Sequence, residues 1–103
     1  MKEINKFDFL ITNFIDYDIN KNIDFNDEIH YYATAIKKVD NQYIAISHNL
    51  NNKAIKIMDL AISLKIEIVK NPPLARTLHM EVEETKEVPN YLTPTLDKIY
   101  QHL

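Results

Sequence analysis

Apolar and polar residues alternate along the first quarter of the chain, where aromatic residues and isoleucine stand between aspartates and asparagines. The apolar positions of this alternation are Phe7, Phe9, Ile11, Ile15, Tyr17, Ile19, Ile23 and Phe25. A period of two residues places alternate side chains on one face of an extended strand. We therefore predict a strand within residues 6–13 that completes a sheet, with residues 19–25 as the alternative.

A β-hairpin is predicted across residues 32–47. Residues 32–37 and 43–47 are short runs rich in alanine, isoleucine and tyrosine, and such runs are typical of strands when turn residues bound them. Asp40 and Asn41 lie between the two runs, and both residue types accept the backbone angles of a tight turn.

Helical periodicity follows the hairpin. Residues 51–63 predict a helix, because most of their apolar positions fall on one helical face and the asparagines before them are good N-caps. Those apolar positions are Ala54, Ile55, Met58, Leu60, Ala61 and Ile62. Residues 65–69 are rich in isoleucine and valine and predict a strand. A hairpin followed by a helix and another strand indicates an α/β domain with the helix on one face of a sheet.

Two more helices are predicted in the last third of the chain. Asn71 is a suitable N-cap, and the two prolines after it fit a first helical turn, where backbone N–H groups lack partners. This helix should extend to about residue 84. Val88-Pro89 interrupts the chain, and residues 89–102 predict a last helix with Pro94 in its first turn.

Composition narrows the class of protein. The chain has 103 residues, enough for a single domain spanning residues 1–103. A net charge of −3 argues against a nucleic-acid-binding surface, and the absence of cysteine excludes disulfides and thiolate zinc sites. No apolar run approaches the roughly 20 residues that span a bilayer, and the N-terminus lacks a signal-peptide pattern. We therefore expect a cytoplasmic protein with no direct membrane insertion.

The chain contains no glycine, which has two consequences. Gly-rich phosphate loops and dinucleotide fingerprints are excluded. Backbone positions with positive φ must be filled by asparagine, aspartate or a strained residue. The candidates are Asn13, Asn20, Asn22, Asn41, Asn49 and Asn90.

Residues that often carry chemistry show no catalytic or metal-binding pattern. The four histidines, His30, His48, His79 and His102, lack close metal-ligand spacing. Glu81, Glu83 and Glu84 fit a solvated helix face better than an acid–base pair, and neither serine has a nucleophile-elbow context. The sequence therefore predicts no catalytic, cofactor or metal site, although a hydrolase or metal enzyme with an unfamiliar site is an alternative.

The second half of the chain resembles the cytoplasmic domain of the FlhB/YscU family, the switch proteins of flagellar and virulence type III export machines. That family shows a strand ending in an NPPLAR-like segment, then a helix, an acidic stretch, "IP" and a final helix. Here the first part is Ile66-Glu67-Ile68-Val69-Lys70-Asn71-Pro72-Pro73-Leu74-Ala75-Arg76, and the second is Glu83, Glu87, Val88 and Pro89. Residues 32–37 are similar to the family's "YAVALK" strand, and residues 54–61 to its "AxxIRxxA" helix.

The resemblance implies an α/β fold with a small mixed β-sheet of about four strands flanked by helices. Residues 30–103 would form the family-like core, and residues 1–29 a divergent segment that supplies an extra strand. The surface around residues 71–76 would bind a partner, although a structural role is the alternative for each of these residues. Thr85 stands where the family often has glycine, so it marks a changed helix end.

The resemblance also implies a lost reaction. Family members cut themselves within an Asn-Pro-Thr-His turn just before the "YAVALK" strand, where the asparagine side chain attacks its own carbonyl carbon. Aligned without gaps, the matching positions here are Glu28, Ile29, His30 and Tyr31. Because these positions hold no asparagine followed by proline, we expect no self-cleavage. The only Asn-Pro pair is Asn71-Pro72, outside the cleavage turn.

The function implied by the resemblance is recognition without chemistry. Full-length family members carry an N-terminal membrane domain that this sequence lacks, so the expected form is a free-standing accessory component of the flagellar export apparatus. Its partners would be export-gate proteins, including the matching N-terminal part of FlhB, and export substrates. It would lie in the cytoplasm, peripheral to the inner-membrane export gate. The alternative is a binding module of the same fold that serves a virulence system or another partner.

Overall fold

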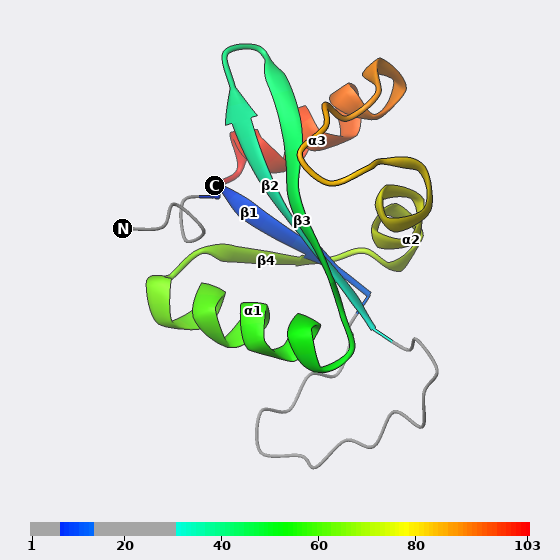
Figure 1. Cartoon of the computed structure of the whole chain (residues 1–103). Coiled ribbons are helices and arrows are strands. Elements are labelled where there is room, and N and C mark those ends of the chain that lie inside the picture. Colours follow the sequence, from blue (N-terminus) through cyan, green and yellow to red (C-terminus); the bar gives the residue numbers. More distant parts are fainter. Residues whose placement is uncertain (1–6, 14–30) are drawn as a thin grey trace.

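Four strands form one mixed sheet with helices on both faces, in a computed structural model that describes residues 7–13 and 31–103 (Figure 1). The strands are β1 (Phe9–Thr12), β2 (Tyr32–Val39), β3 (Gln42–Leu50) and β4 (Glu67–Lys70), in the sheet order β3-β2-β1-β4. The helices are α1 (Asn52–Leu64), α2 (Pro72–Glu81) and α3 (Thr93–Gln101), with a 3₁₀ turn η1 (Asn90–Leu92) before α3. The predicted α/β fold with a four-stranded mixed sheet is confirmed.

β1 lies inside the sheet, antiparallel to β2 and parallel to β4. All four of its side chains are buried. A strand covered on both faces must be apolar on both faces, apart from polar groups that find partners. Thr12 meets that condition, because its hydroxyl donates to the Tyr32 carbonyl at 2.7 Å. The strand predicted within residues 6–13 is therefore confirmed, and the alternative at residues 19–25 lies outside the described residues.

The β2–β3 hairpin is longer than the sequence pattern predicts. Its ladder begins at the pair Val39 and Gln42, so the turn contains only Asp40 and Asn41. Asp40 has a φ of 58°, and aspartate tolerates this left-handed conformation better than most residues. The register shifts between Ala35 and Ile36, which marks a β-bulge in the middle of the hairpin.

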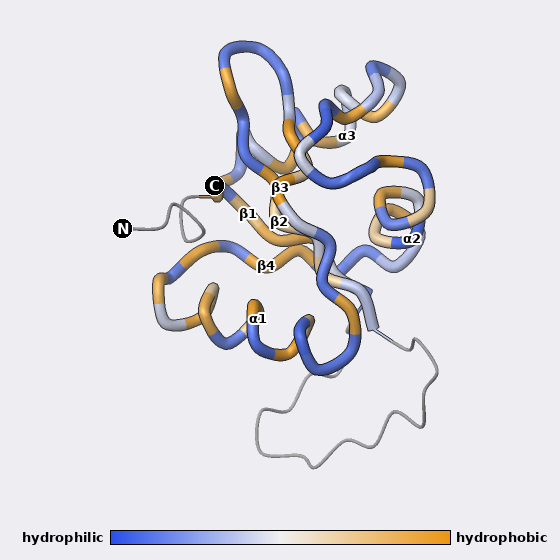
Figure 2. The backbone as a smooth tube through the Cα atoms, in the orientation of Figure 1, coloured by the Kyte–Doolittle hydropathy of each residue, from blue (hydrophilic) through white to orange (hydrophobic). Residues whose placement is uncertain are grey.

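The helices divide between the two faces of the sheet. α1 packs on one face, and α2 and α3 pack on the other, where α2 contacts β1 and β2 and α3 contacts β3. Figure 2 shows hydrophobic residues concentrated in β1 and β4, and hydrophilic residues around the tip of the β2–β3 hairpin. Each face therefore has its own buried core.

Positive φ angles occur at positions that the asparagine pattern did not predict. The four described residues with positive φ are Asp40, Asn51, Lys65 and Thr85. Among the described candidates, the predictions for Asn13, Asn41, Asn49 and Asn90 are wrong, and Asn20 and Asn22 lie outside the described residues. The reason is that turn geometry sets these angles: Lys65 ends α1 as its left-handed C-cap, a place that glycine usually fills.

Two helix boundaries differ from the prediction. α2 ends at Glu81, three residues earlier than expected, because Val82 turns to extended backbone with its side chain buried. The last helix begins at Thr93 and not at Pro89. A continuous helix from Pro89 would need an N–H at Pro94 to bond the Asn90 carbonyl, and proline has none. A separate 3₁₀ turn therefore comes first, and Pro94 lies in the first turn of α3.

Candidate partner-binding surface

The residue-71 turn joins β4 to α2 and is fixed at both ends. The Asn71 N–H donates to the Thr12 carbonyl at 2.9 Å, which continues the parallel pairing of β4 with β1. The Asn71 side-chain oxygen accepts from the Leu74 N–H at 3.2 Å, the geometry of a helix N-cap. Pro72 and Pro73 occupy the first turn, where their missing donors cost nothing. The predicted cap and proline start are confirmed.

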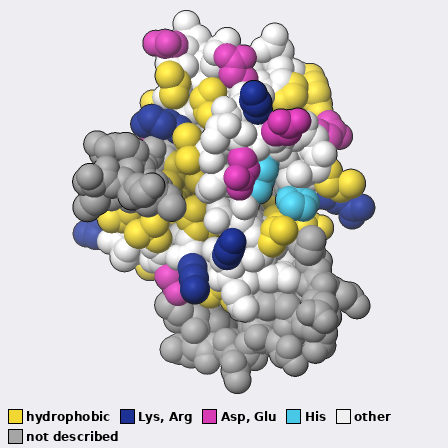
Figure 3. All heavy atoms as spheres, viewed as in Figure 1, with side chains coloured by type: hydrophobic (Ala, Val, Ile, Leu, Met, Phe, Trp, Pro, Cys, Tyr) yellow, Lys and Arg dark blue, Asp and Glu magenta, His cyan; other side chains and the backbone are white. Residues whose placement is uncertain are grey.

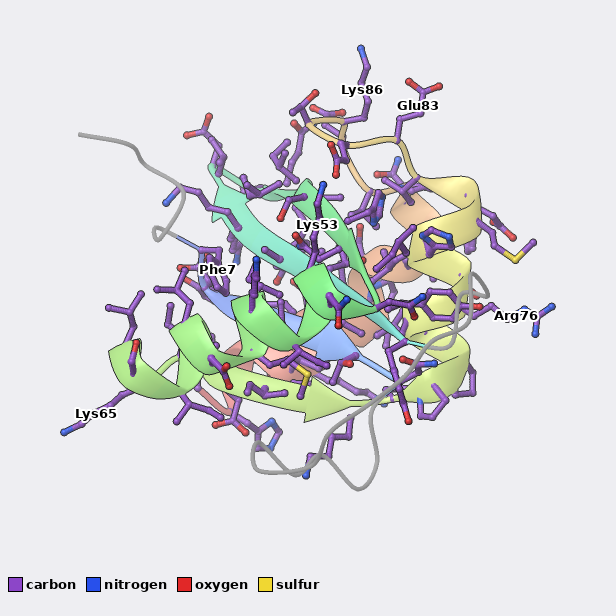
Figure 4. The ribbon with its side chains drawn as sticks, turned by 60° about the horizontal axis from the view of Figure 1, so that its bottom comes forward. Phe7, Lys53, Lys65, Arg76, Glu83 and Lys86 are labelled. Carbon is purple, nitrogen blue, oxygen red and sulfur yellow. The ribbon has the colours of Figure 1, made fainter. Side chains whose placement is uncertain are left out.

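Burial divides the Asn71–Arg76 segment into two parts. Leu74 and Ala75 are buried in the core on the α2–α3 face, so their role is structural. Pro73 and Arg76 are exposed, and Figure 4 shows Arg76 extending from α2 away from the body of the protein. Asn71 and Pro72 are half-buried, so Pro73 and Arg76 are the residues of the segment most available to a partner.

A largely exposed stripe runs along the outer side of α2. Its members are the exposed Pro73, Arg76 and Met80 and the half-buried Thr77, here called the outer α2 stripe. Spacings of three and four residues place these side chains on one helical face. Met80 is 66% exposed, so its long apolar side chain is available for contact beside Arg76. Sequence analysis missed Thr77 and Met80, although the spacing from Arg76 was a usable signal.

Beneath α2, two histidines meet the β2–β3 hairpin. The His79 ring stacks on Tyr32 with 4.7 Å between ring centroids, and the His48 ring meets His79 edge-on at 5.9 Å. His48 donates from Nε2 to the Val82 carbonyl, which leaves Nδ1 to accept from the Thr34 hydroxyl at 2.8 Å. These contacts tie the end of α2 to both hairpin strands.

The surroundings of His79 disfavour its protonated form. Its Nδ1 atom is buried without a hydrogen-bond partner among the described residues. Burial, followed by the nearby His48 ring, lowers the pKa of His79. No group of three or more His, Cys, Asp or Glu side chains converges as a metal site in the described part of the chain.

The segment after α2 covers the outer edge of β3. The Ala45 N–H donates to the Lys86 carbonyl at 3.1 Å, and the Thr85 N–H donates to the Ala45 carbonyl at 2.7 Å. The Glu84 carboxylate accepts from the His48 backbone N–H at 2.7 Å. Thr85 adopts a φ of 66°, a strained angle for a β-branched residue. The changed helix end expected at Thr85 is thus a turn that protects a sheet edge.

A polar contact anchors α3 to the hairpin. The Tyr43 hydroxyl donates to the Asp97 carboxylate at 2.6 Å, and the Lys38 ammonium lies 4.6 Å from the centre of the Tyr100 ring. Burial, then the hydrogen bond to Asp97, raises the pKa of the Tyr43 hydroxyl.

A shallow hollow of about 320 Å³ lies beside the contact between Tyr43 and α3. Its lining residues are Asn41, Gln42, Tyr43, Glu87, Val88, Asn90, Thr93 and Pro94.

Of the four positions aligned with the family's cleavage turn, the structure describes only Tyr31; Glu28, Ile29 and His30 lie outside the described residues. The Tyr31 N–H donates to the Asn51 side-chain oxygen at 3.1 Å, and the Asn51 N–H donates back to the Tyr31 carbonyl at 3.0 Å. Tyr31 therefore holds the start of β2 against the start of α1.

These features define a small α/β domain with a stripe of mostly exposed side chains along one helix. The chain belongs to the FlhB HrpN YscU SpaS family, whose family model matches residues 35–102. Family and fold are those of the type III export switch proteins FlhB and YscU. No curated protein sequence matches the chain closely enough to count as a relative.

Solved structures show the same fold. The cytoplasmic domain of FlhB from Shewanella putrefaciens matches with a TM-score of 0.75 and 23% identity, over 96% of this chain and 70% of that one. A point-mutated C-terminal domain of EscU matches with a TM-score of 0.74 and 16% identity, over 97% of this chain and 87% of that one. In the described part of this chain, no helix is long and apolar enough to cross a membrane.

Proposed function

We propose that this domain is a protein-recognition component of the flagellar type III export apparatus, and that it docks through the outer α2 stripe. The observation that carries the proposal is the divided Asn71–Arg76 segment. Its inner residues are core, whereas Pro73 and Arg76 are presented outward by a capped, proline-started helix. A rigid helix start loses little conformational entropy on binding, which favours recognition.

The proposed partners are export-gate proteins, including the N-terminal part of FlhB, and export substrates. Family membership supports this assignment, because the family is that of the type III export switch proteins. The stripe combines a guanidinium with exposed apolar atoms, and arginine and methionine are both enriched at protein interfaces. A partner surface with a carboxylate beside an apolar patch would suit it.

We further propose that the domain stays uncut. The only Asn-Pro pair in the sequence is Asn71-Pro72. The Asn71 side chain is engaged as the α2 cap, and its carbonyl accepts from the Ala75 N–H at 2.9 Å. An asparagine held in this way is poorly placed to attack its own carbonyl carbon. Mass spectrometry of the purified protein should give a single polypeptide of 12.1 kDa. Two fragments separating near residue 28 would contradict this.

A pull-down with the cytoplasmic parts of the flagellar export gate tests the docking proposal. The variant R76E/M80D should lose capture, because it puts two carboxylates on the stripe. A matched control, K98E/L103D, makes the same change of charge and polarity at exposed positions on and after α3. The proposal fails if both variants bind like the natural chain, or if both lose binding equally.

The same assay separates the flagellar assignment from its alternative. Gate proteins of a virulence export system, offered in parallel, should capture the natural chain more weakly than flagellar ones. Stronger capture by the virulence proteins would keep the recognition role and move it to that system. Rescue of motility, in a strain whose FlhB lacks this domain, would support the flagellar role independently.

A further inference from the structure

A second concave surface lies on the opposite face of the sheet, between α1 and the end of β3. This groove has a volume of about 240 Å³. Its lining residues are Asn49, Lys53, Lys56, Ile57 and Leu60. A helix with its side chains is about 10 Å wide, whereas the outer strands of a four-stranded sheet are roughly 14 Å apart. A single helix therefore leaves part of this face uncovered beside β3.

The groove has an apolar floor. Ile57 is 6% exposed and belongs to the core beneath α1, and Leu60 packs against that core while partly exposed. On the β3 side, the Asn49 amide nitrogen donates to the Ala33 carbonyl at 3.1 Å and to the Ser47 hydroxyl at 2.9 Å. These bonds use both amide hydrogens and fix the side chain. Its oxygen accepts no hydrogen bond from a described residue and is free to accept one from a ligand.

The rim of the groove is basic. Lys53 and Lys56 are both exposed and lie three residues apart on α1, which separates their Cβ atoms by about 5–6 Å. No carboxylate is among the lining residues, and Asp59, the one acid in α1, is not part of the lining. Figure 3 shows basic side chains over α1, beside hydrophobic ones and one acidic one, and Figure 4 shows Lys53 on the β3 side of the helix. A local positive rim on a chain of net charge −3 is selective for acidic partners.

We propose that this groove binds an extended acidic peptide segment of a partner protein, with aspartates alternating with aliphatic or aromatic residues. Carboxylates two residues apart on an extended chain are about 6.5–7 Å apart, a spacing that the long, flexible side chains of the two lysines can span. The apolar residue between them would lie on Ile57 and Leu60. The Asn49 oxygen would accept a peptide N–H. Because the outer α2 stripe is on the other face, this surface is separate from the proposed docking site.

Fluorescence anisotropy with the full chain tests the proposal. The probe is a labelled synthetic peptide in which aspartate alternates with isoleucine and phenylalanine. The variant K53E/K56E should bind it at least about tenfold more weakly, because two ion pairs become two repulsions. Folding should survive, since Lys53 lies in the first turn of α1, where an acid is favourable. The variant K53R/K56R should retain binding.

Controls separate the groove from general charge attraction. K65E/K86E makes the same change of charge at exposed positions away from the groove and should bind like the natural chain (Figure 4). A peptide with asparagine in place of aspartate should bind weakly, and added salt should weaken binding of the original peptide. R76E/M80D should leave peptide binding unchanged, so failure here and failure of the α2 docking proposal are distinguishable.

Three results would overturn the assignment. The first is unchanged peptide binding by K53E/K56E, and the second is an equal loss in K65E/K86E. The third is lysine-dependent binding to vesicles of anionic phospholipid without binding to the peptide, which would make the groove a lipid contact. Thermal unfolding of each variant, followed by circular dichroism, verifies that the proteins compared are folded.

Discussion

The two faces of the sheet are built from side chains of different size. The α2–α3 face buries large residues, among them Phe9, Ile11, Ile36, Tyr43, Leu78 and Leu96. The α1 face buries several alanines, namely Ala33, Ala35, Ala54 and Ala61. Small residues let a helix backbone approach the sheet closely, whereas large residues hold two helices further out. The α1 face also buries large side chains, Phe7, Leu10, Ile57 and Met58, so the two faces differ in the share of small residues and not in kind.

The faces also differ in polar content. The α2–α3 face contains the Tyr43–Asp97 bond and the contacts of His48 with Thr34 and Val82. Such partly buried polar bonds accept only one arrangement of helices, because breaking them leaves groups unsatisfied. In the described part of the α1 face, packing is mainly apolar and relies on shape. The outer α2 stripe therefore sits on the more precisely fixed side of the domain.

Neighbouring residues of β1 test this comparison directly. Leu10 and Ile11 are both fully buried and belong to opposite cores. Ile11→Ala should lower the free energy of unfolding by about 4 kcal/mol, and Leu10→Ala by about 3 kcal/mol, because the single helix α1 can relax toward the cavity more easily than two anchored helices. Urea denaturation followed by circular dichroism measures both.

The control for this pair is Ile62→Ala on the outer side of α1. Ile62 is 52% exposed, so its loss should change the free energy of unfolding by no more than about 0.5 kcal/mol. If Leu10→Ala proved costlier than Ile11→Ala, the proposed difference in rigidity between the faces would be wrong.

Residue patterns predicted which helices and strands form better than they predicted the residues at which these elements begin and end. Period-two alternation located β1, and Asn71 with its prolines located the start of α2, because both signals are local. The early end of α2 could not be read from the sequence. Val82 is apolar and continues the helical stripe, but in the fold it is buried beside β3, where the next segment pairs with the strand edge. That pairing is a long-range constraint.

The sequence indicated only part of the candidate surface, because long-range packing again decides the rest. The Asn71–Arg76 segment was identified, but which of its residues face solvent depends on where α2 packs. Leu74 and Ala75 turned out to be core, and Met80 extended the exposed stripe. The α1–β3 groove was not predicted, because its two sides come from elements that meet only in the folded sheet.

The starts of α1 and α2 offer a second comparison. Asn71 caps α2 with its side chain, whereas the described α1 start has no side-chain cap bond. Asn71→Ala should therefore lower the free energy of unfolding by about 1 kcal/mol, and Asn71→Ser should restore most of it. Chemical denaturation of the three proteins measures this. Equal stability of the alanine and serine variants would show that the cap contributes nothing.

The two sides of the sheet also differ at backbone positions with positive φ. Thr85 on the α2–α3 side and Lys65 at the end of α1 both have positive φ, but only threonine is β-branched. Thr85→Gly should raise the free energy of unfolding by about 0.5–1 kcal/mol, since relief of strain exceeds the added freedom of the unfolded chain.

Lys65→Gly is the matched change, and its gain should be smaller than that of Thr85→Gly. Thermal unfolding of both variants beside the natural chain ranks them. A loss of stability in Thr85→Gly would mean that contacts of the threonine side chain outweigh its backbone strain.

Stability should also depend weakly on pH, through His79 on the α2–α3 face. The pKa of His79 lies below its usual value of 6.5 because of burial and then His48. Below pH 6.5 the unfolded chain takes up a proton that the folded chain resists, so stability falls as pH is lowered through this range and is fully present above it. His79→Phe keeps a ring against Tyr32 and removes the titrating group. Its stability relative to the natural chain, measured by urea denaturation at about pH 8 and about pH 5, should improve at the lower pH. Parallel pH dependence in the two proteins would show that His79 does not carry the effect.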